Sequence, residues 1–355
     1  MTRFSAFDHA MMARALALAQ KGLFTSTPNP RVGCVLAQGE SVVGEGWHEK
    51  AGGPHAEVVA IDKAGSRAAG ATMYVNLEPC SHQGRTPPCV DFIKKNKINR
   101  VIAAMLDPNP QAAHGGAQLA AAGIGFEHGL MADEAKELNI GFVSRMTRGR
   151  PWVRMKIAAT LDGRTALADG RSQWITGAEA RKDGHRWRAR ACAILTGIGT
   201  VKADDPRLTV REVETPRQPF RVVVDSRLEI PADARIFEGG NVLIFCGVDP
   251  KRQLGGEIQK LPNSDGKVDL PKMLEELARR GVNELHVEAG FRLNGSLVRE
   301  GCVDEFLVYL NPSFLGDEAQ GMLALSGIVS LEQKIKTRIV SLDRIGDDIR
   351  ILARL

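Results

Sequence analysis

The sequence predicts an α/β protein with two domains, and three observations carry this prediction. The chain has 355 residues, which is more than one ordinary hydrophobic core needs. Segments with strand character alternate with segments of helical periodicity in both halves. The polar stretch 148–151 lies between the halves and ends in Pro151, a helix breaker. We expect a domain at 1–147, a linker at 148–151 and a second domain at 152–355.

The composition narrows the class of protein. The net charge of +5 and aromatic content of 5% do not amount to a nucleic-acid-binding surface, although a mild positive bias suits a phosphorylated substrate. Six dispersed cysteines indicate no disulfide framework and favour the reducing cytoplasm. No apolar run approaches the ~20 residues of a membrane span, so we expect neither a membrane nor a nucleic acid as partner.

The first half predicts a compact α/β unit. Apolar residues at helical spacing predict a helix over 8–20. Asn29, held between Pro28 and Pro30, reads either as a turn residue or as an amide presented to a substrate. The further elements expected are a hairpin of strands 32–37 and 41–47, a helix that begins at His55, strands 72–77 and 100–106, and helices 116–122 and 132–146.

The second half repeats the alternation. Expected strands lie at 153–158, 193–196, 220–225, 242–246, 284–288 and 305–310, expected helices lie at 178–190, 271–280 and 293–300, and a terminal hairpin joins 337–342 to 348–352. The dinucleotide fingerprint Gly-x-Gly-x-x-Gly is absent. A weaker signal is Gly290 after a strand, with Gly295 and Ser296 expected to start the next helix, where backbone N–H groups can hold phosphate.

A metal motif organises the first half. His55, Cys80 and Cys89 supply the three ligands of a catalytic zinc ion, with a fourth position left to water. Glu57 follows the histidine by two residues, where a carboxylate can act as general acid and base without ligating the metal, as in zinc-dependent base deaminases. Taken separately, His55 and Glu57 also fit an ordinary surface pair, and the two cysteines also fit small buried apolar residues. A structural zinc is disfavoured because it needs four protein ligands.

The spacing of the cysteines departs from the general deaminase signature. That signature closes with Cys-x-x-Cys, whereas eight residues, 81–88, separate Cys80 from Cys89. The metal loop is therefore longer and rich in hydrogen-bond donors.

With these motifs in place, the chain resembles the bifunctional deaminase/reductase family of riboflavin biosynthesis over nearly its whole length. The long metal loop is that family's version of the signature. The resemblance rests on 27–33 (TPNPRVG), 55–57 (HAE), 79–89 (PCSHQGRTPPC), 156–165 (KIAATLDGRT), 172–176 (SQWIT), 204–206 (DDP), 208–211 (LTVR), 224–226 (VDS) and 287–290 (VEAG).

The resemblance implies a fold, two reactions and two cofactors. The expected fold is a cytidine-deaminase-like domain followed by a dihydrofolate-reductase-like domain. The first domain would bind one Zn²⁺ and deaminate 2,5-diamino-6-(5-phosphoribosylamino)pyrimidin-4(3H)-one. The second would use NADPH to reduce the phosphoribosyl group of the product to phosphoribityl. A homo-oligomer is expected.

The resemblance also implies ligand positions. Asn29 and His48 match substrate positions of the deaminase. In the reductase, the NADPH side takes Ala158, Trp174, Thr200, Asp204, Ser226, Gly290, Phe291, Arg292, Leu293, Asn294, Gly295 and Ser296, and the substrate side takes Ser172, Arg188, Leu208, Arg211 and Glu288.

Several alternatives stay open at this point. Trp174 fits a packing role equally well, Arg188 fits a solvated helix face, and Lys156 is either a strand lysine or a proton-handling group. For the whole chain, the rivals are a nucleic-acid base deaminase with an accessory domain and a non-enzymatic binding protein that zinc stabilises.

Overall fold

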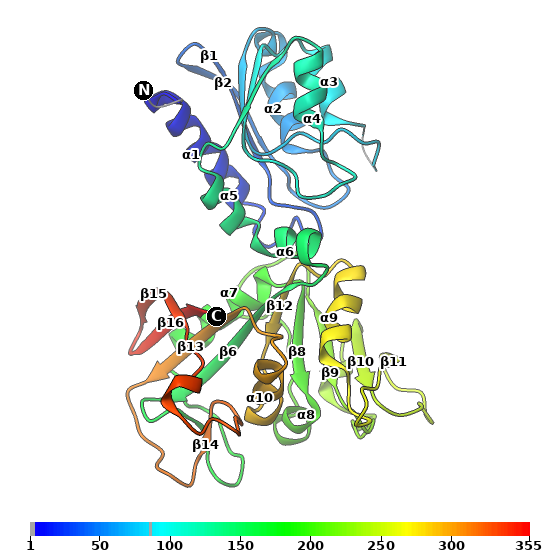
Figure 1. Cartoon of the computed structure of the whole chain (residues 1–355), viewed down its shortest axis with the longest axis vertical. Coiled ribbons are helices and arrows are strands. Elements are labelled where there is room, and N and C mark those ends of the chain that lie inside the picture. The colour runs from blue at the N-terminus through cyan, green and yellow to red at the C-terminus, as the bar shows by residue number, and fades with distance from the viewer. Residues whose placement is uncertain (1–3, 85–86) are drawn as a thin grey trace. The chain divides into compact units, whose positions relative to one another are not determined.

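The computed structural model describes residues 4–84 and 87–355. The chain divides into two compact units, Met1–Arg148 and Gly149–Leu355 (Figure 1). Arg85 and Thr86, which belong to the predicted metal loop, lie outside the described residues. Across 4–84 and 87–355, no helix has both the length and the apolar character needed to cross a bilayer.

The first unit is built on one sheet, whose described strands have the order β2-β1-β3-β4-β5. β1 runs antiparallel to β2 and β3, whereas β3, β4 and β5 are parallel to one another. The elements are α1 (Ala6–Gln20), β1 (Gly33–Gln38), β2 (Ser41–Trp47), α2 (Ala56–Ala64), η1 (Gly65–Ala68), β3 (Thr72–Leu77), α3 (Cys89–Lys95), β4 (Arg100–Met105), α4 (Gly115–Ala121), β5 (Gly125–His128), α5 (Ala132–Leu138) and α6 (Ile140–Arg148).

Helices cover both faces of this sheet. α1 and α5 pack on one face, and α2, α3 and α4 lie on the other (Figure 1). The contact between α2 and β2 is close because Gly44 and Gly46 face the helix backbone. A Cβ atom at Gly46 would lie 2.4 Å from Ala56 O, so this position requires glycine. The close contact fixes α2 and the His55 residue at its amino end.

Two boundaries in the first unit differ from the prediction. The helix expected over 132–146 is two helices, because Asn139 leaves helical geometry between them. The buried Asn139 side chain accepts a hydrogen bond from Arg31 N at 2.8 Å and donates one to Arg31 O at 3.0 Å. The linker expected at 148–151 starts later, because Arg148 is the last residue of α6. The Arg148 side chain donates to Ser144 Oγ one turn earlier, which favours helical geometry there.

The second unit contains a larger sheet, whose described strands have the order β11-β10-β9-β8-β12-β6-β13-β16-β15. Its strands are parallel up to β13, and β16 and β15 extend it as an antiparallel hairpin. The elements are β6 (Trp152–Thr160), β7 (Arg164–Ala166), α7 (Ala178–Arg190), β8 (Ala193–Gly197), α8 (Ile198–Asp204), β9 (Phe220–Val224), η2 (Arg235–Phe237), β10 (Val242–Cys246), β11 (Glu257–Lys260), α9 (Leu270–Arg279), β12 (Glu284–Val287), α10 (Phe291–Arg299), β13 (Glu305–Asn311), β14 (Gln320–Gly321), η3 (Leu331–Gln333), β15 (Arg338–Ile345) and β16 (Asp348–Arg354).

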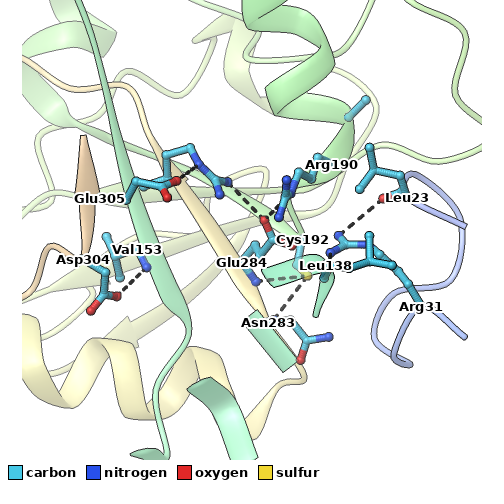
Figure 2. Close-up of polar contacts among 12 residues, drawn as sticks. Leu23, Arg31, Leu138, Val153, Arg190, Cys192, Asn283, Glu284, Asp304 and Glu305 are labelled. Carbon is cyan, nitrogen blue, oxygen red and sulfur yellow. Dashed lines mark hydrogen bonds and ion pairs between the residues drawn. The ribbon is translucent and has the colours of Figure 1, made fainter. Parts of the chain in front are cut away.

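The two faces of this sheet differ in chemistry. One face is apolar: Met155 of β6 and Leu285 of β12 belong to a buried cluster with residues of α9 and α10. The other face carries a buried ionic network near the amino ends of the strands. Arg154, which is 2% exposed, bonds Glu284 at 3.1 Å and also pairs with Glu305. Figure 2 shows Glu284 shared with Arg190, at 2.7 Å. The network satisfies charges that would otherwise be costly to bury.

The sequence predictions missed several elements of the second unit and misplaced one helix start. The missed elements include α8 and the short strands β7, β11 and β14, and β5 was missed in the first unit. α10 begins at Phe291, with Gly290 as its N-cap, so Gly295 and Ser296 do not start the helix. Gly295 instead permits tight packing, because a Cβ atom there would lie 2.2 Å from Ala324 O.

Candidate functional sites

Three elements bring His55, Cys80 and Cys89 together. His55 is the N-cap of α2, Cys80 follows β3, and Cys89 is the first residue of α3. His55 Nδ1 lies 3.2 Å from Cys89 Sγ and 3.6 Å from Cys80 Sγ. All three ligand atoms lie within 4.8 Å of one another. Zinc bonds of about 2.0 Å to nitrogen and 2.3 Å to sulfur fit between these atoms.

The protonation of the two cysteines also suits a metal cation. Hydrogen bonds from Cys89 and His55 lower the pKa of Cys80, which favours its thiolate form. The pKa of Cys89 is raised, first because its thiol donates to Cys80 and then because it is buried. A bound cation would favour both thiolates. The donor set of one imidazole and two thiolates therefore fits zinc.

Glu57 lies in the first turn of α2, and its side chain is only 4% exposed. Burial raises the pKa of its carboxyl group, although the His55 charge opposes this. A carboxyl group whose pKa is raised towards neutrality can accept and return a proton within one catalytic cycle. The site thus places a candidate proton carrier next to the three metal-ligand candidates.

Asn29 and His48 form a second part of this site. Pro54 O lies 2.9 Å from His48 Nδ1, so Nδ1 carries the proton, and Nε2 accepts from Asn29 Nδ2 at 3.0 Å. Burial lowers the pKa of His48, which keeps the ring neutral. The His48 and His55 rings meet edge to face, with centroids 5.4 Å apart. The pair orients the Asn29 amide beside the metal-ligand cluster.

Glu78 is a supporting residue that sequence reasoning did not single out. Its carboxylate accepts from Gly116 N at 2.8 Å and from Asp107 N at 3.1 Å. It therefore ties the start of the metal loop to α4 and to the segment after β4. The sequence indicated this role of Glu78 only through its position between a predicted strand and Pro79.

The second unit contains a cleft of about 1350 Å³. The cleft lies at the carboxyl ends of β8, β9 and β12, where open α/β sheets place their ligands. α7, α8, the start of α10, part of β6 and the segments 170–176 and 205–212 contribute further walls. The predicted residues that line it are Ala158, Ser172, Trp174, Arg188, Thr200, Asp204, Leu208, Arg211, Ser226, Glu288, Gly290, Phe291, Arg292, Leu293 and Asn294. Gly295 and Ser296 are outside this lining, because they lie beyond the first turn of α10.

An ion pair stands on the α7 side of the cleft. Arg188 Nη2 donates to Glu288 Oε2 at 2.8 Å, Nε bonds the other carboxylate oxygen, and Nη1 donates to Thr209 O at 3.0 Å. Burial alone would raise the pKa of Glu288, but the Arg188 charge holds it well below its usual range. Burial lowers the pKa of nearby Lys156. Arg188 is thus a paired cleft residue and not part of a solvated helix face.

α7 adds two cleft residues that the sequence predictions did not include. Arg181 and His185 precede Arg188 at spacings of seven and three residues, and all three line the cleft. Arg181 also stacks over the exposed Trp174 ring at 4.8 Å. Spacings of four and three residues separate Arg181, His185 and Arg188, and such spacings indicate in the sequence that the side chains share one helix face.

These features define a class of protein: a deaminase-like domain with a zinc-type site, joined to an α/β domain with a nucleotide-sized cleft. Comparisons with known proteins agree. Residues 5–105 match the cytidine and deoxycytidylate deaminase zinc-binding region, and residues 151–351 match the RibD C-terminal domain. The chain belongs to the RibD family of riboflavin biosynthesis proteins.

Individual relatives match over nearly the full length. The RibD protein of Escherichia coli K12 is 44% identical, over 96% of this chain and 98% of that protein. The structure of Acinetobacter baumannii RibD superposes with a TM-score of 0.91 at 39% identity, over 98% of each chain. The structure of a diaminohydroxyphosphoribosylaminopyrimidine deaminase/5-amino-6-(5-phosphoribosylamino)uracil reductase from Thermotoga maritima gives a TM-score of 0.89 at 31% identity, also over 98% of each chain.

The family membership confirms the expected resemblance, the expected fold class and the expected enzyme class. The chain is a bifunctional enzyme of riboflavin biosynthesis, with a deaminase domain of the zinc-binding type and an NADPH-dependent reductase domain.

Proposed function

We propose that the first domain, 1–147, deaminates 2,5-diamino-6-(5-phosphoribosylamino)pyrimidin-4(3H)-one, and that the second domain, 152–355, reduces the phosphoribosyl group of the product to phosphoribityl. The observation that carries this proposal is the pairing of buried Glu57 with the His55, Cys80 and Cys89 cluster, on the same chain as the basic cleft of the second unit. The relative from Thermotoga maritima, which combines a deaminase and a reductase of this kind, supports the same pair of activities.

In the deaminase, we assign His55, Cys80 and Cys89 as zinc ligands. When bound, zinc would activate a water molecule for attack on the ring carbon that bears the amine. Glu57 accepts the proton released from that water, delivers it to the ring nitrogen and assists the departure of ammonia. Asn29, which His48 orients, holds the pyrimidine.

In the reductase, NADPH supplies the hydride, and the cleft residues orient the two molecules. The positions assigned to NADPH are Ala158, Trp174, Thr200, Asp204, Ser226 and 290–294, and the positions assigned to the substrate are Ser172, Arg188, Leu208, Arg211 and Glu288. Their common lining of one cleft supports their assignment to a single reductase site, and the division between the two molecules follows the family motifs. Lys156 lies in the same lining and is the candidate proton-handling group.

Coupled turnover tests the proposed function. We expect the diaminopyrimidine phosphate to release one ammonia and then consume one NADPH per molecule. Chelation of zinc is expected to stop both events with this substrate but to leave NADPH oxidation intact with the deaminated substrate. Consumption of NADPH by zinc-free enzyme on the diamino substrate would contradict the proposed order. Ammonia release from single-stranded tRNA or DNA, with none from the diaminopyrimidine phosphate, would favour a nucleic-acid deaminase.

We also propose that the chain forms a homo-oligomer through β15. This strand is the edge of the second sheet, and edge strands offer unpaired backbone groups to another chain. Ile339 and Leu342 of β15 are 59% and 62% exposed. An antiparallel pairing of two such edges closes as a symmetric dimer.

A cytoplasmic location is proposed as well, supported by six free cysteines, all buried.

Replacing both Ile339 and Leu342 with aspartate is expected to produce a monomer of 38.5 kDa in analytical ultracentrifugation, because the charges repel across the paired edges. Val248→Asp, a change at an exposed apolar residue elsewhere, is the matched control and should sediment as the wild type does. An unchanged sedimentation coefficient for the double variant would exclude β15 as the interface.

A further inference from the structure

His185 is a cleft residue of the reductase domain to which the proposed function gives no role. It lies on α7 one helical turn before Arg188, and only 5% of its surface is exposed. The neighbouring Gly184 also lines the cleft, and a Cβ atom there would meet no other atom within 4 Å. The helix therefore leaves free space for a ligand next to the imidazole.

The position of the imidazole proton follows from one hydrogen bond. Arg211 N donates to His185 Nδ1 at 3.2 Å. A backbone N–H can only donate, so Nδ1 must carry a lone pair, and the single proton of the neutral ring is on Nε2. Among the interactions of the described residues, His185 Nε2 has no protein partner. The acceptor atom of the ring, Nδ1, is therefore bonded to Arg211 N. The donor group, Nε2–H, remains available to a ligand.

The charges around His185 favour an anion as the ligand. Lys156, Arg188 and Arg211 are the cations that act on the ring, and Glu288 is the one anion among the groups that act on it within the described chain. Glu288 is already paired with Arg188, and the Arg211–Glu212 pair is long, at 3.8 Å, and half exposed, so it is weak and positive charge remains in excess. Burial and these cations lower the pKa of His185 to about 4, which keeps the ring neutral.

We propose that His185 is a substrate-contact residue of the reductase: its Nε2–H group donates a hydrogen bond to a phosphate oxygen of the phosphorylated pyrimidine. This inference rests on the proposed reductase function and adds a phosphate contact to it. Arg211 contributes in two ways, since its backbone fixes the His185 tautomer and its side chain lies in the same cleft lining.

The test compares the deaminated substrate with its dephosphorylated form. His185→Leu removes both the donor and the acceptor, whereas His185→Gln keeps a donor N–H and an acceptor oxygen. We expect His185→Leu to raise the KM, or the competitive inhibition constant, of the phosphorylated form by about 10- to 100-fold, as expected for loss of a hydrogen bond to a charged group. The dephosphorylated form should change by less than about threefold, and His185→Gln should stay close to the wild type for both forms.

Two controls keep the outcome interpretable. Arg186→Gln changes the adjacent residue of α7, which is exposed and outside the cleft lining, and should leave both constants unchanged. The NADPH dissociation constant, measured by fluorescence, should be the same in all variants if the domain is folded. An equal loss for the two forms, or wild-type constants in His185→Leu, would overturn the phosphate contact. Failure of the wild type to oxidise NADPH with the phosphorylated form would instead reject the proposed function.

Discussion

Glu57→Gln is expected to lower the deaminase kcat by about a thousandfold, within the range that general acid–base catalysis contributes. Glutamine has nearly the size and shape of glutamate, so the buried position of Glu57, which is 4% exposed, remains filled. The amide cannot accept the proton that water must lose or deliver it to the ring nitrogen. Ammonia release from the diaminopyrimidine phosphate measures this effect directly.

The same chain supplies the controls for Glu57→Gln. Zinc content should remain at one ion per chain, because the variant keeps His55, Cys80 and Cys89. NADPH oxidation with the deaminated substrate should be unchanged, because the reductase domain is untouched. Asp62→Asn, an exposed change on the same helix, should retain full deaminase activity. Full turnover by Glu57→Gln would show that the proton carrier is a different group.

Local sequence signals predicted the metal-ligand cluster because each part of it is short-range. The strand at 72–77 agrees with β3 to the residue, since a short, mainly apolar segment followed by Glu78-Pro79 leaves little freedom in its bounds. Cys80 then follows the strand, and Cys89 starts a helix directly after Pro88. The three ligands lie at the ends of predictable elements, so their approach could be foreseen without knowledge of distant contacts.

The reductase cleft was harder to predict because its geometry depends on long-range pairing. Register between β6 and β13 pairs Arg154 with Glu305, and this pairing contributes to the ionic network on one sheet face. No local pattern reveals such a register. The start of α10 was misplaced for a related reason: Gly295 resembles a helix-start glycine in sequence, but its role is close packing against Ala324. The helical spacing of His185 and Arg188 indicated a shared face, but the hydrogen bond from Arg211 N to His185 Nδ1 joins residues distant in the sequence and could not be predicted.

Arg188→Met is expected to lower the reductase kcat/KM at pH 7 by about 100-fold or more, because it leaves a largely buried carboxylate without its partner. Arg188 and Glu288 are both assigned to the substrate side, and loss of a hydrogen bond to a charged group costs about 1.5–3 kcal/mol, with each 1.36 kcal/mol corresponding to about tenfold. The broken ion pair lowers the folding stability in addition. Glu288 loses both bonds that Arg188 donates to its two oxygens. Arg186→Met, on the exposed side of α7, removes the same charge without touching Glu288 and serves as the control.

The pH dependence of Arg188→Met separates this electrostatic effect from a simple loss of packing. In the wild type the pKa of Glu288 is depressed, so the stabilisation from the pair is present above the ordinary glutamate pKa of about 4.3 and is lost only as the pH falls through the depressed value. Without Arg188 this pKa rises from its depressed value, because burial is then opposed only by His286 and Lys156, and the stabilisation from the ionised carboxylate is lost at a higher pH than in the wild type. The acid limb of kcat/KM should therefore move to higher pH, because substrate binding by the carboxylate requires ionisation. A reduced rate with an unshifted pH profile would instead assign Arg188 to packing, because Arg188 has the largest effect among the groups that lower the pKa of Glu288.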